Sequence, residues 1–295
     1  MSAWTVAGLA AMMAMGLAGA GATSLAVGPL ALGVRAVAAV AVTAVACAGL
    51  GVGWPDLTES PMTVAGRVVV AVAGIVAGAG VMVWRDMFAV TLAAGLGVVC
   101  LVGAELAFAP APRDLSGAEP RRAAPGSGGR PAPMTVSLPG AVTGALVSTA
   151  GACWVALAAA PQWSGTAVIA CFVVVAAVAG DQIGRTYRAN SLGALCGGIL
   201  GGLLVGAAAW AAARGGIALP RVLPHLARGI GDTAAILVAG LATGVSVALA
   251  VIAVDGLLGD HGRRHPTARG GLARGCAKFL VAVLPFYVMI RVGGI

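Results

Sequence analysis

The charged residues of this chain are confined to a few short breaks between long runs of Ala, Gly, Val and Leu. Of 295 residues, only 18 are Lys or Arg and only 10 are Asp or Glu. The apolar runs are about 20 residues long, which is the length that an α-helix needs to cross the hydrocarbon core of a bilayer. The pattern therefore predicts an all-α, polytopic bundle of transmembrane helices.

The composition supports a membrane protein and excludes a water-soluble domain. Hydrophobic residues make up 60% of the chain, charged residues 9%, and the mean hydropathy is +1.00. A soluble domain with so few polar groups could not cover its own surface. The net charge of +8 comes from basic residues scattered over several breaks, with no lysine-rich tail. We therefore expect the lipid bilayer, and not nucleic acid, as the partner of these residues.

About nine helices are predicted from the lengths of the apolar runs. They cover residues 4–28, 32–53, 62–84, 87–108, 138–160, 165–180, 192–213, 234–258 and 277–293. The first 53 residues hold two spans only if the chain turns near Pro29. Trp54, at the end of the second span, is expected to lie at the membrane interface, as aromatic residues at span ends do.

The longest break, 109–137, divides the chain into two membrane blocks. It is rich in Pro, Gly, Ser and Arg and has no apolar periodicity, which is typical of a flexible linker. We therefore expect a block of about four helices over 1–108, the linker, and a block of about five helices over 138–295.

The orientation follows from the side on which the basic breaks fall. When the breaks are assigned alternately to the two sides, one side holds most of the Lys and Arg residues. These are Arg67, Arg113, Arg121, Arg122, Arg130, Arg185, Arg188, Arg263, Arg264, Arg269, Arg274 and Lys278. The positive-inside rule makes this side cytoplasmic, together with the N-terminus, in a bacterial plasma membrane. Cys276 is then expected to face the cytosol.

Glycines recur at a spacing of four in several predicted helices. Such rows of small residues allow another helix to approach the backbone closely. Internal packing, a contact between subunits and a gating contact all fit them. The rows are Gly193, Gly197 and Gly201; Gly198, Gly202 and Gly206; Gly74 with Gly78; and Gly240 with Gly244.

Three charged residues fall inside the predicted spans, each close to the cytoplasmic end. They are Arg67, Glu105 and Asp255. At such positions a long side chain can extend to the interface at little cost, so we interpret them as membrane-boundary charges. No relay of Asp, Glu or His residues is visible, which argues against an ion-coupled carrier.

The sequence predicts no catalytic or metal-binding residues and no cofactor. The six cysteines form no CxxC pair, and His261 and His265 lie in a Gly/Arg/Pro segment that would not hold them on one helix face. Residues 255–266 resemble the opening motif of the CbiB family of membrane enzymes, although in that family the motif follows the first span. A membrane enzyme would require Asp255 or His265.

The second half of the chain resembles the EccD family, the polytopic subunit of type VII secretion systems. In that family a span ends in an Arg-aromatic-Arg turn before a Gly-rich helix, and the last span has a proline near its middle. The segment GRTYRA, 184–189, and Pro285 take these places here. Residues 105–117, ELAFAPAPRDLSG, also resemble the entry of the family into its mid-chain linker.

The resemblance implies a non-enzymatic scaffold or channel-like subunit, two copies of which form a membrane vestibule beside an FtsK-type ATPase. The family has eleven spans, six before the linker and five after it. The predicted arrangement departs from the EccD pattern in two ways. The N-terminal ubiquitin-like domain and two of the spans are not expected in this sequence, and the acidic residue typical of the last span is replaced around Lys278. The alternative is a small-solute transporter of the ten-span, two-repeat type, which would need internal symmetry and a polar pocket within the membrane.

Overall fold

The structure is a computed structural model that describes residues 30–58, 62–84, 88–108, 134–159, 164–184, 186–214, 224–258 and 267–293. All the regular structure in these ranges is helical, with no strand, as the sequence predicts. The helices are α2 (Leu30–Thr58), α3 (Val64–Trp84), α4 (Phe88–Phe108), α5 (Met134–Ala150), α6 (Ala152–Ala159), α7 (Ser164–Asp181), α8 (Tyr187–Arg214), α9 (Pro224–Ile230), α10 (Asp232–Leu258) and α12 (Ala268–Gly293).

Six segments of the described chain are long and apolar enough to cross a membrane. They are Ala36–Thr58, Val64–Trp84, Leu138–Ala159, Tyr187–Ala211, Asp232–Leu258 and Ala268–Arg291. Two shorter apolar segments, Val90–Ala104 and Ala170–Asp181, lie in α4 and α7. These are the helices of a membrane-embedded protein. The predicted count of nine spans is not confirmed by them, and the predicted span 4–28 lies outside the described residues.

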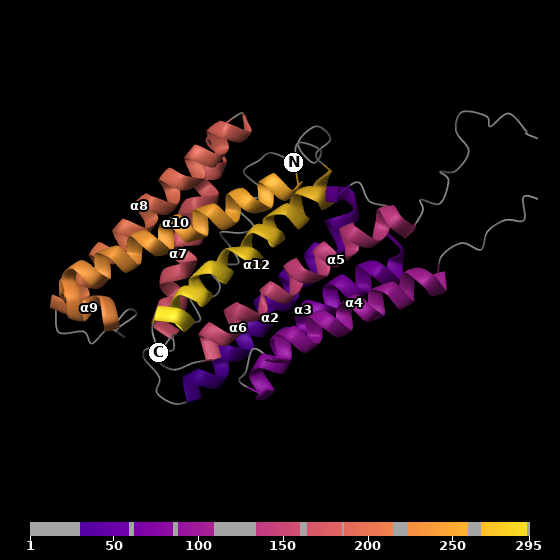
Figure 1. Ribbon diagram of the computed structural model, residues 1–295, viewed down its shortest axis with the longest axis horizontal. Coiled ribbons are helices and arrows are strands. Elements are labelled where there is room, and N and C mark those ends of the chain that lie inside the picture. The colour runs from indigo at the N-terminus through magenta and orange to yellow at the C-terminus, as the bar shows by residue number, and fades with distance from the viewer. Residues whose placement is uncertain are drawn as a thin grey trace, which may run out of the picture.

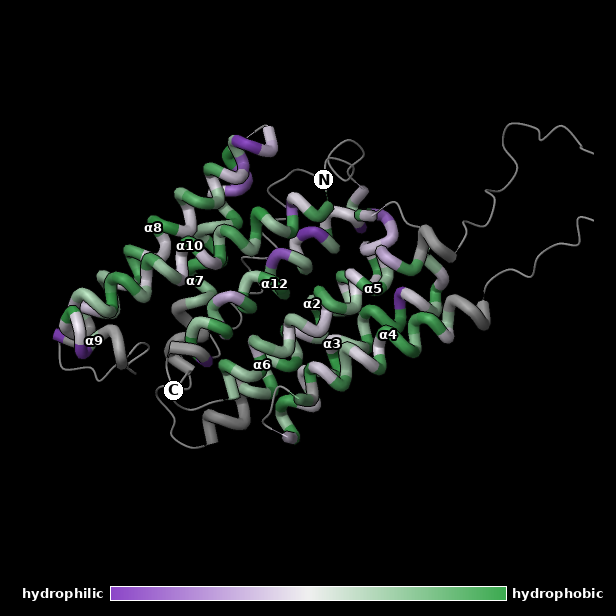
Figure 2. The backbone as a smooth tube through the Cα atoms, in the orientation of Figure 1, coloured by the Kyte–Doolittle hydropathy of each residue, from purple (hydrophilic) through white to green (hydrophobic). Residues whose placement is uncertain are grey.

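The outward faces of these helices are apolar, as lipid contact requires. Val72 and Val76 of α3, Leu96 of α4 and Leu200 and Leu204 of α8 are all exposed. Figure 2 shows hydrophobic positions along most of the length of the helices. Lipid tails are as apolar as these side chains, so the helices must be held together by close packing and by polar contacts inside the bundle.

The last helix begins nine residues earlier than the sequence predicts. The hydroxyl of Thr267 accepts a hydrogen bond from the backbone N–H of Gly270 at 2.9 Å, which caps the first turn of α12. The Gly- and Arg-rich segment that follows, predicted as a loop, is therefore helical. As a result Arg269, Arg274 and Lys278 lie on a helix and not in a loop.

The helices form two groups, which are visible side by side in Figure 1. Helices α7, α8 and α10 pack on one another and form one group, with α9 at the edge of α10. Helices α2 to α6 and α12 form the other. Because α5, α6 and α12 from the second half of the chain pack against α2 and α3 from the first half, the boundary between the groups in space is not at the 109–137 linker.

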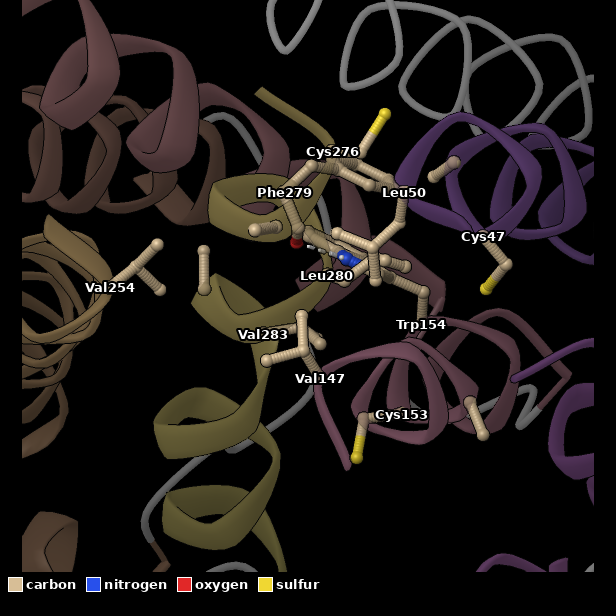
Figure 3. Packing of buried hydrophobic residues seen from close by; sticks show 14 of the residues in the cluster. Cys47, Leu50, Val147, Cys153, Trp154, Val254, Cys276, Phe279, Leu280 and Val283 are labelled. Carbon is tan, nitrogen blue, oxygen red and sulfur yellow. Dashed lines mark hydrogen bonds between the residues drawn. The ribbon is translucent and has the colours of Figure 1, made fainter. Parts of the chain in front are cut away.

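Large side chains fill the core of the second group (Figure 3). The indole ring of Trp154 on α6 stacks on the ring of Phe279 on α12, with the centroids 5.1 Å apart. The indole N–H of Trp154 donates to the backbone carbonyl of Phe279 at 2.9 Å. Cys276, three residues earlier on α12, is fully buried, so the predicted exposure of its thiol to the cytosol is wrong.

Trp54 is also buried, four residues before the end of the apolar segment Ala36–Thr58, so its ring packs inside the bundle. Its place at the membrane interface stays a prediction. Its indole N–H donates to the backbone carbonyl of Gly140 on α5 at 2.7 Å. The ring lies over Gly144, where an added Cβ would come within 2.8 Å of the indole nitrogen. The aromatic residue that marks the end of a span in the sequence is here a contact between two helices.

Candidate functional site

A cluster of four charged side chains lies between the two groups of helices. The ammonium group of Lys278 on α12 donates to Oδ2 of Asp255 on α10 at 3.0 Å and also to Oδ2 of Asp181 on α7. The side chains of Lys278, Asp181 and Asp255 are 1%, 2% and 3% exposed. The cluster therefore joins three helices through charges that are out of contact with solvent.

The fourth member of the cluster is Arg274, one turn before Lys278 on the same face of α12. Its Nε lies 3.6 Å from Oδ1 of Asp255. The cluster thus pairs two carboxylates with two cationic side chains. This balance matters because an unpaired buried charge is strongly unfavourable, whereas a paired one recovers much of its lost solvation.

The charged residues of the cluster lie at different positions along their three helices. Asp181 is the last residue of α7, and Asp255 lies three residues before the end of α10. Lys278, by contrast, is ten residues beyond the start of α12, which corresponds to about 15 Å along the helix axis. The early start of α12 therefore places the cluster within the bundle and not in a loop outside it.

The two carboxylates differ in their surroundings. Asp255 is paired with both Lys278 and Arg274, whereas Asp181 is paired only with Lys278 among the charged residues described. The side-chain amide of Gln182 donates to Oδ2 of Asp181 at 2.7 Å. Oδ1 of Asp181 is buried and has no hydrogen-bond partner in the described part of the chain.

The chemistry available at this cluster is electrostatic and proton-exchanging. Within the described ranges, no group of three or more His, Cys, Asp or Glu residues could hold a metal ion. The cluster contains no serine, threonine or cysteine nucleophile. Its carboxylates can bind a proton, and its four charges can fix the relative position of α7, α10 and α12.

The structure places the three predicted boundary charges differently from one another. Asp255 does not extend to the interface; it is buried in the cluster, which is a correction of the sequence prediction. Arg67 lies half-buried in the first turn of α3. Glu105 lies in the last turn of α4, and its side chain lies outside the described residues.

Most of the arginines predicted to set the orientation lie outside the described part of the chain. Arg188 is exposed in the first turn of α8. The predicted residues that lie outside the described ranges are Arg113, Arg121, Arg122, Arg130, Arg185, Arg263 and Arg264, together with His261 and His265.

The first glycine row of α8 contacts α7. A Cβ added at Gly193 would collide with the backbone carbonyl of Gly180, and one added at Gly197 would collide with that of Ala176. A Cβ at Gly201 would meet the Cβ of Ala176 at 2.6 Å. The backbones of the two antiparallel helices are thus in direct contact.

The second glycine row of α8 contacts α10 in the same way. A Cβ at Gly198 would collide with the carbonyl of Gly244, and one at Gly202 would collide with that of Gly240. At Gly206 the nearest atom, the carbonyl oxygen of Ile236, would be 3.4 Å away, so the helices diverge there. Both rows of α8 therefore pack inside this chain.

The shorter row on α3 is uneven. A Cβ at Gly74 would collide with Oγ of Ser148 on α5, whereas one at Gly78 would lie 3.4 Å from Val155 on α6, an ordinary contact. Glycine is therefore required by close packing at Gly74 but not at Gly78.

Sequence reasoning missed three members of the charged cluster: Asp181, Arg274 and Lys278. The sequence contains a signal for two of them, Lys278 and Asp181. Lys278 is the only lysine in the chain, and Asp181 follows an apolar run directly, with no polar residue between. Neither signal identifies a partner, because Asp181 and Lys278 are 97 residues apart in sequence.

Comparisons with known protein families, with curated proteins and with solved structures give no match for the chain.

Proposed function

We propose that this chain is a non-enzymatic, integral membrane scaffold or channel-like subunit of a multi-protein secretion complex of the type VII class. The observation on which the proposal depends is the arrangement of helices after the linker. Only five residues separate the end of α7 at Asp181 from the start of the glycine-rich helix α8 at Tyr187, and α12 follows a basic segment of the sequence and contains Pro285. These are the positions at which the EccD family has its Arg-aromatic-Arg turn, its Gly-rich helix and its last, proline-containing span.

The interior of the bundle supports a structural role. The rows of α8 are filled by backbone contacts with α7 and α10, and the four charges of the cluster are paired with one another. These groups thus contact other parts of the same chain. The broad apolar faces of α3, α4 and α8 are left for lipid or for other membrane subunits.

The proposal includes the topology that the basic residues predict. The chain crosses a bacterial plasma membrane about nine times, with the N-terminus and the 109–137 linker in the cytoplasm. Its partners are further secretion subunits, including an FtsK-type ATPase, or a second copy of itself.

Co-purification in a mild detergent tests this function. We expect the tagged chain, expressed in its native host, to be recovered in a complex that contains an FtsK-type ATPase. An unrelated polytopic protein with the same tag and expression level is the control. Recovery of the chain only as a monomer, under conditions in which other membrane complexes stay intact, would contradict the proposal.

A second candidate, a small-solute transporter, is favoured by one observation. Charges buried between transmembrane helices are the usual mark of a transport path, and Asp181, Asp255 and Lys278 form such a group. A transporter predicts substrate flux by the purified chain in proteoliposomes, with no other subunit present. A scaffold predicts none.

A membrane enzyme is disfavoured by the position of Asp255. Its carboxylate is buried and bonded to Lys278, so it is not presented to a substrate. We expect alanine substitution of His265 to leave the function of the chain unchanged. A complete loss of function in that variant would favour the enzyme.

A further inference from the structure

We propose that the buried cluster between α7, α10 and α12 is a proton-binding site, and that the proton binds to Asp181. This inference does not depend on the secretion subunit proposed above, because it concerns a site within the chain itself. It rests on three features of the cluster: unequal pairing of its two carboxylates, an unpartnered buried oxygen, and access from the end of α7.

The pairing is the first feature. One ammonium group, that of Lys278, is shared between two carboxylates, and the second cation, Arg274, pairs with Asp255. If the cluster gains one proton, the carboxylate with fewer cationic partners is the one that is neutralised at the lower energetic cost. That carboxylate belongs to Asp181.

The unpartnered oxygen is the second feature. Oδ1 of Asp181 is buried and accepts no hydrogen bond from the described residues, so no protein donor stabilises the ionised carboxylate on that side. Asp181 is also the last residue of α7, where the helix dipole disfavours a negative charge. Protonation removes both penalties.

Access is the third feature. Beyond Asp181 the chain turns, and Gln182 is half-buried while Ile183 and Thr186 are exposed. A proton can therefore reach the carboxylate from the end of the bundle without crossing the apolar core. Among the described residues, the other titratable or charged groups at the cluster are Asp255 of α10 and Arg274 and Lys278 of α12; Tyr187 of α8 lies beside Gly256 of α10.

The step itself is simple. A proton from water forms a bond to a carboxylate oxygen of Asp181 and makes it a neutral carboxyl group, and no electron is transferred. Lys278 keeps its proton and its ion pair with Asp255. The charge attraction between α7 and α12 is then lost, while that between α10 and α12 stays. Proton binding would thus loosen one group of helices from the other at α7.

Infrared difference spectroscopy on the full chain in lipid nanodiscs tests the proposal. The probe is the proton, added by lowering the pH in steps within the range where circular dichroism shows the protein still folded. A protonated carboxyl group away from water absorbs at a higher frequency than one that is hydrogen-bonded to water. We expect the wild-type protein to gain one such high-frequency carbonyl band on acidification.

Variants assign the band. It should be lost in Asp181→Asn. In Asp255→Asn it should still appear, but only at lower pH, because Lys278 is then no longer shared with a second carboxylate. The matched control is Asp232→Asn, which removes an exposed carboxylate at the opposite end of α10 and should leave the band unchanged. If Asp181→Asn does not fold, Asp181→Glu replaces it and should displace the frequency of the band.

Two outcomes would overturn the proposal. One is the absence of the high-frequency band in the wild-type protein, which would mean that the cluster stays ionised and only fixes the helices in place. The other is a band that persists in Asp181→Asn, or is unmoved in Asp181→Glu, which would assign the proton to another residue.

Discussion

The two groups of helices differ in how much of their packing depends on large side chains. In the glycine-packed group, α7, α8 and α10, backbones touch one another through Gly180, Gly193, Gly198 and Gly202. In the side-chain-packed group, α2 to α6 and α12, large residues such as Trp54 fill the space between helices. Trp154 is another of them (Figure 3).

The difference shows two solutions to one physical problem. In lipid, burial of apolar side chains between helices yields little net gain, so stability must come from close contact and from hydrogen bonds. The first group obtains it through backbone contacts at glycines. The second group has such contacts at Gly53 and Gly74, and in addition packs large side chains together and bonds indole N–H groups to backbone carbonyls. The buried charges lie where the two groups meet.

The largest expected effect is in the glycine-packed group. Gly202→Leu would force α8 away from the backbone of α10, and we expect it to cost more than about 4 kcal/mol or to prevent folding. Unfolding in mixed micelles, followed by circular dichroism, measures this cost. The control is Gly95→Leu on α4, where an added Cβ meets no other atom and the change should be tolerated.

The boundary between the groups is tested by Lys278→Met. This change leaves two carboxylates buried with one cation fewer, and we expect a loss of about 3–5 kcal/mol in the free energy of unfolding. Arg269→Met, at an exposed position on the same helix, should change it by less than about 0.5 kcal/mol. Equal effects of the two changes would show that the cluster does not hold the groups together.

A smaller effect separates two glycines that look alike in the sequence. Gly74→Ala places a methyl group against Ser148 and Cys47, and we expect a cost of about 1–3 kcal/mol. Gly78→Ala, one turn later on α3, adds only an ordinary contact with Val155 and should be close to neutral. Thermal unfolding of both variants decides this. A reversed order would mean that α3 is not packed against α5 and α6 as described.

The smallest expected effect is in the side-chain-packed group. Trp154→Phe keeps an aromatic ring on Phe279 but removes the indole N–H that donates to its carbonyl. Hydrogen bonds between membrane helices contribute about 0.6 kcal/mol on average and rarely more than 1.7 kcal/mol, so we expect a loss in this range. Trp84→Phe, at an exposed position, is the control and should have no measurable effect.

Much of the helical architecture was predictable because it depends on local composition. Apolar runs of membrane length indicate helices wherever they occur, and the glycines of α8 recur at the spacing that places them in rows. The start of α12 was predicted too late because its first turns, rich in Gly and Arg, are typical of a loop. Two contacts extend the helix: the cap at Thr267 and the close approach of Gly53 to the Arg269 carbonyl. Neither contact changes the hydropathy of the segment, so a prediction from hydropathy misses both.

The charged residues show most clearly where helix packing, and not local composition, sets the outcome. Composition and residue spacing are enough to establish that the chain is a helical membrane protein with glycine-lined helices and few charges. They could not determine that Asp255 is buried, because a carboxylate near the end of a span is equally consistent with lipid headgroups and with a partner. That choice depends on Lys278 and Asp181, which are distant in sequence and meet only when α7, α10 and α12 pack. Hydropathy is a property of each residue alone, whereas the free-energy cost of burying a charge depends on whether an oppositely charged side chain lies next to it.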